Sequence, residues 1–258
     1  MKQKLTIVCA SGDILERPES LRSLIKDLTA IKGGKILVHG GSGSEMDTTF
    51  ASQMKVKVRR AGDDKPIISD RLIDVLIMVH AGLINKRLVA LLQRAGVSAV
   101  GLSGADLNLL VAVQKDKEHG RQGVIRKVNT PLLQQLLESK VVPVLCPIAY
   151  DSTAQPFYLD EREITSVVAR VLALAREVSI IYLTDRHGVL MNDNDPNSVI
   201  ANLSRSQFNN MKETGLIEGD AADLVESAFA SIDHGVSRVF ITSVERLSHL
   251  EKATVIKP

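Results

Sequence analysis

Short apolar runs rich in β-branched residues alternate with stretches of helical periodicity along the chain. Residues 5–9 form the first such run, which predicts a buried strand. The stretch that Pro18 opens predicts a helix with one apolar face, formed by Leu21, Leu24, Ile25 and Leu28. Gly33 and Gly34 are expected to end this helix, and residues 35–38 predict the second strand.

The same alternation continues to the last residues. Strands are predicted at residues 98–102, 141–145, 178–184, 238–242 and 253–256, and a hairpin around residues 122–128. Helices are predicted at residues 70–95, 164–172 and 221–234, and a short one from Thr130, the expected N-cap, with Pro131 at the first helical position. Repeated strand–helix–strand units predict a single α/β domain over residues 1–258, with a mostly parallel sheet and helices on both faces.

In open parallel sheets, ligands bind beyond the carboxyl ends of the strands. The loops after Cys9, Val38 and Thr184 are therefore the candidate binding loops. Residues 39–44 are rich in glycine, whose bare backbone amides can hold an anion, and a plain tight turn is the alternative. Asp185 ends the most apolar strand, where it could contact a ligand or cap a turn.

Composition excludes several classes of protein. The chain has 32 basic and 30 acidic residues, scattered among each other, and only 3% aromatics, so no nucleic-acid partner is expected. Cys9 and Cys146 lie in apolar runs and are expected to be buried and reduced. The six histidines form no i, i+4 pair, so no metal site is predicted. Charges interrupt the longest apolar runs and no signal peptide is recognised, which predicts no membrane span and a cytoplasmic protein.

Several segments together resemble the amino-acid kinase family, and within it the acetylglutamate kinases. They are residues 5–8, 37–41, 82–86, 100–106, 142–144, 183–185 and 188–189, in the family's order and at about its spacing. The resemblance implies an αβα three-layer sandwich in which residues 1–175 bind an N-acyl-glutamate and residues 176–258 bind ATP with Mg. The family transfers a phosphoryl group from ATP to the side-chain carboxylate of an N-acyl-L-glutamate, in arginine biosynthesis.

The charged residues of the family are not kept. The family's two catalytic lysines fall on Cys9 and Leu224, and the aspartate that organises them falls on Arg162. The substrate arginine falls on Pro66, beside which Lys65 could reach a carboxylate. Because neither a thiol nor a leucine can stabilise a negative transition state, no catalytic residue is intact.

Other positions of the family's sites are kept or changed without loss of polarity. The expected substrate-binding positions are Gly40, Gly41, Ser42, Lys65, Tyr158 and Asp160. The expected nucleotide-binding positions are Gly12, Asp185 and Gly188. Asp220 and Asp223 replace part of the second lysine motif and would add negative charge near the phosphates.

Three interpretations therefore stand together. The chain is a homologue with little or no kinase activity, or an active N-acetyl- or N-succinyl-glutamate kinase in which Lys65, Arg162 or Lys212 supplies the charge, or a regulatory subunit that acts through its surface. The helix that contains Val75 and Ile84 is apolar on more than one face. The resemblance implies that it crosses its twin in a homodimer.

Overall fold

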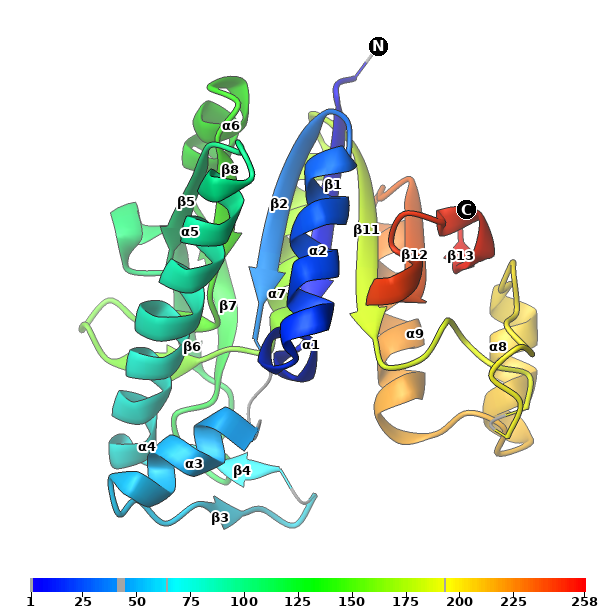
Figure 1. Cartoon of the computed structure of the whole chain (residues 1–258). Helices are drawn as coiled ribbons and strands as arrows, with labels where there is room; N and C mark the ends of the chain where they lie inside the picture. Colours follow the sequence, from blue (N-terminus) through cyan, green and yellow to red (C-terminus); the bar gives the residue numbers. More distant parts are fainter. Residues whose placement is uncertain (1, 41–44, 64, 193) are drawn as a thin grey trace.

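The computed structural model describes residues 2–40, 45–63, 65–192 and 194–258. Seven strands form the central sheet, in the order β13-β12-β11-β1-β2-β8-β5. Their bounds are β1 (Lys4–Ala10), β2 (Gly34–His39), β5 (Ala99–Leu102), β8 (Val142–Leu145), β11 (Glu177–Thr184), β12 (Arg238–Ser243) and β13 (Thr254–Ile256). Neighbouring strands are parallel except β12 and β13, so the predicted mostly parallel sheet is confirmed (Figure 1).

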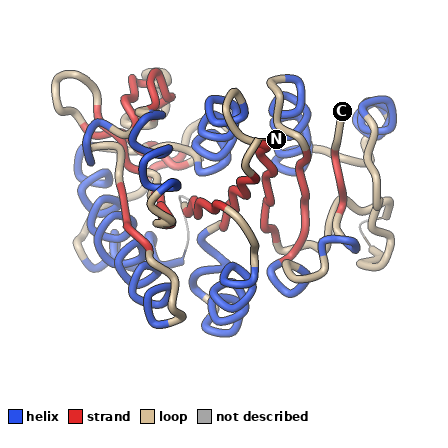
Figure 2. The backbone as a smooth tube through the Cα atoms, turned by 90° about the horizontal axis from the view of Figure 1, so that it is seen from above, coloured by secondary structure: helices blue, strands red, loops and turns tan. Residues whose placement is uncertain are grey.

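Helices cover both faces of this sheet (Figure 2). One face carries α2 (Pro18–Ala30), α4 (Asp70–Leu76) and α5 (Asn85–Arg94). The other carries α6 (Thr130–Glu138), α7 (Glu161–Ala173) and α9 (Gly219–Asp233), and α8 (Arg205–Glu213) packs beside α9. Successive residues of β1 enter opposite layers, because side chains alternate across a strand: Ile7 and Cys9 join one core, Val8 and Ala10 the other.

Two smaller sheets lie beside the central one. β10 (Pro156–Tyr158), β9 (Ile148–Tyr150), β6 (Leu110–Gln114) and β7 (Gly123–Val128) form a four-stranded sheet, in which β6 and β7 are the predicted hairpin. β3 (Arg59–Arg60) and β4 (Pro66–Ile67) form a short antiparallel hairpin. Two further helices follow strands of the central sheet, α1 (Gly12–Glu16) after β1 and α3 (Glu45–Gln53) after β2.

The predicted helix at residues 70–95 is continuous but changes its winding. Between α4 and α5 lies η1 (Ile77–Ile84), a π-helical stretch. The expectation of no membrane span stays a prediction, because the helix at residues 70–94 is long and apolar enough to cross a membrane only by length and composition. In the structure this is a core helix with an outer face, because 44% of its apolar window is buried within the fold.

The start of α6 differs from the prediction by one residue. The N-cap is Asn129 rather than Thr130, and its side-chain oxygen accepts a hydrogen bond from the Leu132 amide at 3.3 Å. Both residues are good N-caps, so composition alone could not choose between them.

Candidate functional site

The carboxyl ends of β1, β2 and β11 meet at one edge of the central sheet. Ala10 lies opposite His39 on one side and Leu183 on the other, so the loops predicted to bind a ligand do converge. A cleft of about 530 Å³ opens there, lined by residues of β1, β11, α7, α9 and the loops after β1 and β11. We call this cavity the strand-end cleft. Its volume lies in the range of about 300–1,000 Å³ that is usual for ligand pockets.

The three residues on which the resemblance places the family's lysines and organising aspartate all line the strand-end cleft. Cys9 and Leu224 are buried in one apolar core cluster, and Arg162 stands at the first turn of α7. Burial, and then the charge of Glu161, raise the pKa of the Cys9 thiol well above its usual value, so Cys9 is uncharged at neutral pH. Two of the three positions thus offer the cleft no charge.

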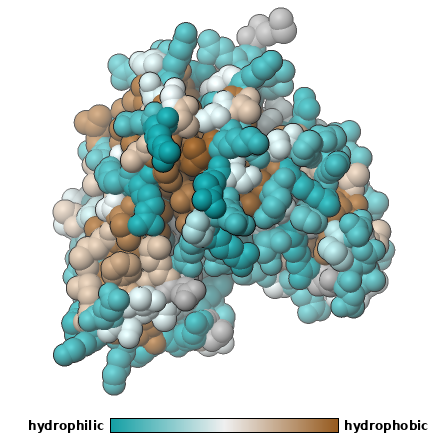
Figure 3. Space-filling model, in the orientation of Figure 1, coloured by the Kyte–Doolittle hydropathy of each residue, from teal (hydrophilic) through white to brown (hydrophobic). Residues whose placement is uncertain are grey.

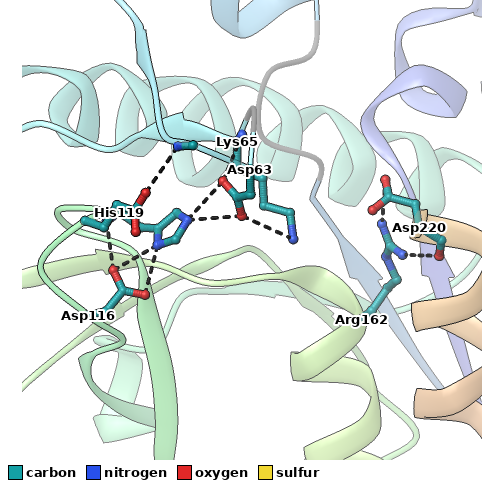
Figure 4. Close-up of polar contacts among 8 residues, drawn as sticks. Asp63, Lys65, Asp116, His119, Arg162 and Asp220 are labelled. Atoms are coloured by element: carbon teal, nitrogen blue, oxygen red, sulfur yellow. Dashed lines mark hydrogen bonds and ion pairs between the residues drawn. The ribbon is translucent and has the colours of Figure 1, made fainter. Parts of the chain in front are cut away.

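Arg162 is engaged with α9 across the cleft (Figure 4). Its Nη1 donates a hydrogen bond to the Asp220 backbone carbonyl at 3.1 Å, and its Nη2 lies 3.6 Å from Asp220 Oδ2. Although burial favours the neutral form, the carboxylates of Asp160, Glu161 and Asp220 raise the pKa of Arg162. The guanidinium therefore stays charged and links α7 to α9.

Carboxylates outnumber cations around the strand-end cleft. Among the described residues that line it, six are acidic and three are basic: Asp13, Glu161, Asp185, Glu218, Asp220 and Glu245 against Arg17, Arg162 and Arg186. The excess is three negative charges, and no lysine is among these residues. A cleft lined by one sign of charge attracts ligands of the other sign.

Of the three predicted nucleotide-binding residues, two line the strand-end cleft and one does not. Asp185 lines the strand-end cleft, and the turn after β11 is closed by Thr184, whose hydroxyl accepts from the Arg186 amide at 3.2 Å. Gly188 lines it too, but its packing alone requires glycine, since a Cβ would lie 2.7 Å from Thr254 Oγ1. Gly12 is buried at the start of α1 and does not line the cleft.

The kept glycine loop begins against a buried carboxylate. A Cβ on Gly40 would lie 2.8 Å from both Cβ and Oε2 of Glu161, so only glycine fits there. The predicted positions Gly41 and Ser42 lie outside the described residues.

A second cavity, of about 240 Å³, lies between α3, α4 and the β3–β4 hairpin, and we call it the hairpin cavity. Pro66, on which the resemblance places the family's substrate arginine, lines it, and so does Arg60, which pairs with Pro66 across the hairpin. Lys65 is exposed, does not line it, and has its Nζ 4.0 Å from Asp63 Oδ2. Arg60 is thus a basic residue of this cavity that the sequence reasoning overlooked. Its place beside Pro66 depends on the pairing of the two-residue strands β3 and β4.

The hairpin is held to the β6–β7 loop through His119 (Figure 4). The His119 Nδ1 lies 2.8 Å from Asp116 Oδ1, and the Nε2 lies 3.2 Å from Asp63 Oδ1. Hydrogen bonding to Asp116, followed by that to Asp63, raises the pKa of His119 although burial opposes it. We call these three residues the His119 clip.

Tyr158 and Asp160 have structural surroundings. Tyr158 is 2% exposed and lines neither cavity, and its ring meets that of His80 edge-on at 5.4 Å. Asp160 is the N-cap of α7, accepting from the amides of Arg162 at 2.7 Å and Glu163 at 3.2 Å. Their predicted contacts with a substrate stay predictions.

Comparison with known proteins points to one family. The sequence profile of the amino acid kinase family matches residues 4–243. The acetylglutamate kinase of Phocaeicola vulgatus is 36% identical over 260 residues, covering 100% of both chains, and that of Parabacteroides distasonis is 35% identical, covering 98% of both.

Solved structures agree on the fold. N-acetylglutamate synthase from Neisseria gonorrhoeae, complexed with coenzyme A and N-acetyl-glutamate, superposes with a TM-score of 0.79 at 22% identity, over 99% of this chain and 59% of that one. Carbamate kinase from Giardia lamblia, bound to AMP-PNP, gives a TM-score of 0.70 at 14% identity, over 99% and 98% of the two chains. At these identities the likeness establishes the fold alone.

Proposed function

Because the chain belongs to the amino acid kinase family, we propose that it is a member that keeps the family's fold and ligand cavities but has little or no phosphoryl-transfer activity. Its similarity to acetylglutamate kinases supports ATP-dependent phosphorylation of an N-acyl-L-glutamate, in arginine biosynthesis, as the reaction of its relatives. The observation that carries the proposal is that Cys9, Leu224 and Arg162 line one cleft together.

Phosphoryl transfer depends on positioning and on neutralising the charge of the transferred group. At the two family lysine positions the strand-end cleft offers an uncharged thiol and a leucine. Arg162, the cation at the third of these family positions, is bound to Asp220. Since one such charge is worth a factor of about 10³ or more in rate, losing both lysines leaves the reaction without its main stabilisation.

ATP with Mg fits the lining of the cleft poorly. The six carboxylates would repel a triphosphate, and the three guanidiniums do not balance them. We therefore expect ATP to bind weakly, with no clear rise in melting temperature when ATP and Mg are added.

A coupled assay with ATP and N-acetyl-L-glutamate or N-succinyl-L-glutamate tests the proposal directly. We expect no turnover near the range of about 1–100 s⁻¹ that is usual for kinases. The Phocaeicola vulgatus acetylglutamate kinase, assayed in the same buffer, is the positive control. Turnover of this chain within tenfold of that control would refute the proposal.

The alternative is an active kinase with a rearranged site. It is favoured by one observation, that Arg17 and Arg186 also line the strand-end cleft. Lys212 does not line it, and its Nζ lies 3.0 Å from Glu226 Oε2. If turnover is found, Arg17→Ala and Arg186→Ala should abolish it, while Lys212→Ala should leave it unchanged.

The hairpin cavity is the place we propose for an N-acyl-glutamate-like ligand, with Arg60 rather than Lys65 meeting its carboxylate. Arg60 lines this cavity beside apolar walls formed by Val58, Ile68 and Leu72. Isothermal titration of N-acetyl-L-glutamate into the Arg60→Gln and Lys65→Gln variants shows which of the two side chains binds the carboxylate. Binding that only Lys65→Gln weakens would contradict the assignment.

We propose a homodimer that packs through η1. Met78 and Leu83 of this helix are 49% and 36% exposed, and apolar atoms gather on the face that carries it (Figure 3). Light scattering should give twice the mass of 28.1 kDa, and Met78→Glu should halve it. Two buried free cysteines fit the reducing cytoplasm, where we place the protein.

A further inference from the structure

The segment that leads into the β3–β4 hairpin carries a local excess of positive charge. Residues 54–60 include four basic residues and no acidic one, although the whole chain is nearly balanced at 32 basic and 30 acidic residues. Lys55, Lys57 and Arg59 are exposed, and the side chains of these three form no hydrogen bond or ion pair with a described residue. We call these three residues the basic strip.

The basic strip faces away from the fold, because side chains alternate along an extended backbone. Val56 is buried in the core, and Val58 and Arg60 line the hairpin cavity. The side chains of Lys57 and Arg59, which alternate with these, do not line that cavity and point outward. They leave the backbone about 7 Å apart, which is twice the rise per residue of a strand.

β3 is also an edge of its sheet. This sheet has the order β3-β4, and beyond β4 Ile68 bridges Gly120, so the described strands leave the outer side of β3 unpaired. In Figure 1 β3 runs along the lower edge of the molecule, with β4 above it. Met54 and Val58, beside the basic strip, are 44% and 38% exposed. Arg71 Nη2 donates to the Met54 carbonyl at 3.4 Å, which brings a further cation to this edge.

The described carboxylates of the same region are engaged elsewhere. Asp63 belongs to the His119 clip, and Asp70 accepts a hydrogen bond from Arg121 Nε at 2.6 Å. Glu118 accepts one from a backbone amide of the hairpin at 3.1 Å. Since these carboxylates do not neutralise the basic strip, its positive potential is directed at a partner outside the chain.

We propose that the basic strip binds an extended acidic segment of a partner protein, with carboxylates at alternate positions. Alternate side chains of an extended peptide leave one face at the same spacing of about 7 Å, so successive carboxylates can meet Lys57 and Arg59. The open edge of β3 can take such a segment as an added strand, with Met54 and Val58 in apolar contact beside it. A nucleic acid is less suitable, because residues 54–60 include no aromatic ring on which a base could stack.

Fluorescence anisotropy of the full chain with a labelled peptide of alternating glutamate and threonine tests this proposal. The peptide should bind, and its binding should weaken as salt is added, because exposed charges are screened. The same peptide with glutamine in place of glutamate should bind about tenfold more weakly, because it keeps the backbone and loses the charges.

Variants show whether the charges act from this edge or through the net charge of the chain. Replacing the whole basic strip should weaken binding of the glutamate peptide about tenfold, since each exposed ion pair contributes roughly a factor of two. The variant is Lys55→Gln, Lys57→Gln and Arg59→Gln together. The control removes the same charge from three exposed positions on and just after α2, and should bind as wild type does. It is Arg22→Gln, Lys26→Gln and Lys32→Gln together. Circular dichroism checks that both proteins are folded.

The proposal is wrong if the glutamine peptide binds as tightly as the glutamate peptide, or if the variant without the basic strip binds as the α2 control does. Tighter strip-dependent binding of a short single-stranded DNA or of phosphatidylserine vesicles would assign the basic strip to that partner and would also overturn the proposal. The outcome is separable from that of the proposed function, because the basic strip does not line the strand-end cleft. Kinase turnover therefore overturns the proposed function alone, and absence of peptide binding overturns this proposal alone.

Discussion

Arg162→Ala is the perturbation that measures how the strand-end cleft is held together. The guanidinium makes two contacts with Asp220, of different kinds. The hydrogen bond to the backbone carbonyl has a charged donor, and such bonds contribute about 1.5–3 kcal/mol. The ion pair with the carboxylate is 3.6 Å long and its Asp220 side chain is 78% exposed, so it contributes about 0.5 kcal/mol.

We therefore expect Arg162→Ala to lower the free energy of unfolding by about 2 kcal/mol, taking the lower end for the hydrogen bond at this partly open cleft. For a chain of this length, that corresponds to a fall in melting temperature of about 4–8 °C. A double-mutant cycle with Asp220→Ala removes the carboxylate but leaves the carbonyl, so the coupling energy should be only about 0.5 kcal/mol.

Urea denaturation of the four proteins in the cycle, with unfolding followed by circular dichroism, gives these values. A coupling energy above about 1.5 kcal/mol would mean that the ion pair dominates. A loss below about 0.5 kcal/mol for Arg162→Ala would mean that Arg162 is not held and is available to a ligand. The first result would refute the division of the energy between the two contacts, and the second would refute the engagement of Arg162 between α7 and α9.

Three further changes test other parts of the structure. Gly40→Ala should lower the free energy of unfolding, measured by urea denaturation, by about 1–3 kcal/mol, because the added Cβ meets a buried side chain at 2.8 Å. Gly34→Ala is the control: its added Cβ has ordinary contacts at 3.4 Å, so the loss should be less than about 1 kcal/mol. Because the pKa of His119 is raised in the folded chain, the stability that protonated His119 adds is complete below about pH 6.5 and is lost as pH rises through the raised pKa. The melting temperatures of wild type and His119→Ala should therefore converge toward high pH. A difference that stays constant with pH would count against the His119 clip. Burial raises the pKa of Cys9, and that of Cys146 to about 12, so Ellman's reagent at pH 8 should label neither thiol until the chain is unfolded, and fast labelling would contradict their burial.

The central sheet could be predicted because its pattern is strong. The strand at residues 178–184 is apolar except at Ser179 and Thr184, and the structure has it as β11, paired on both sides within the sheet. Runs of this kind have few alternatives, since a parallel strand is buried on both faces. The same pattern predicts that the loops after β1, β2 and β11 lie at one edge of the sheet, which is where the strand-end cleft opens.

The short elements escaped prediction. The strands β3 and β4 are two residues each, too short for alternation to be visible, and only their pairing brings Arg60 beside Pro66. The Arg162–Asp220 contact joins residues 58 positions apart, and no local pattern encodes it. From the sequence, Arg162 could be considered as a replacement cation because its charge is evident there, whereas its partner Asp220 is not.

Cys9 and Leu224, on which the resemblance places the family's lysines, bear on stability as well as on charge. Both side chains belong to the same core cluster as Tyr182 and Val225. Burying a leucine is worth about 1.5–3 kcal/mol, whereas burying an ammonium without a partner is unfavourable. Leu224 therefore contributes to the fold at a position where a charge would weaken it, which is the usual opposition between stability and a charged active site.

That opposition fits the proposal of a scaffold kept without the charges that the resemblance implies. With both lysine positions apolar, the acidic residues around the strand-end cleft lose the cations that would balance them, and Arg162 alone remains to link α7 with α9. A cleft in this state is stable at its floor and negative at its rim. Such a lining repels a triphosphate, so the weak ATP binding and the low phosphoryl-transfer activity that we propose depend on the same positions.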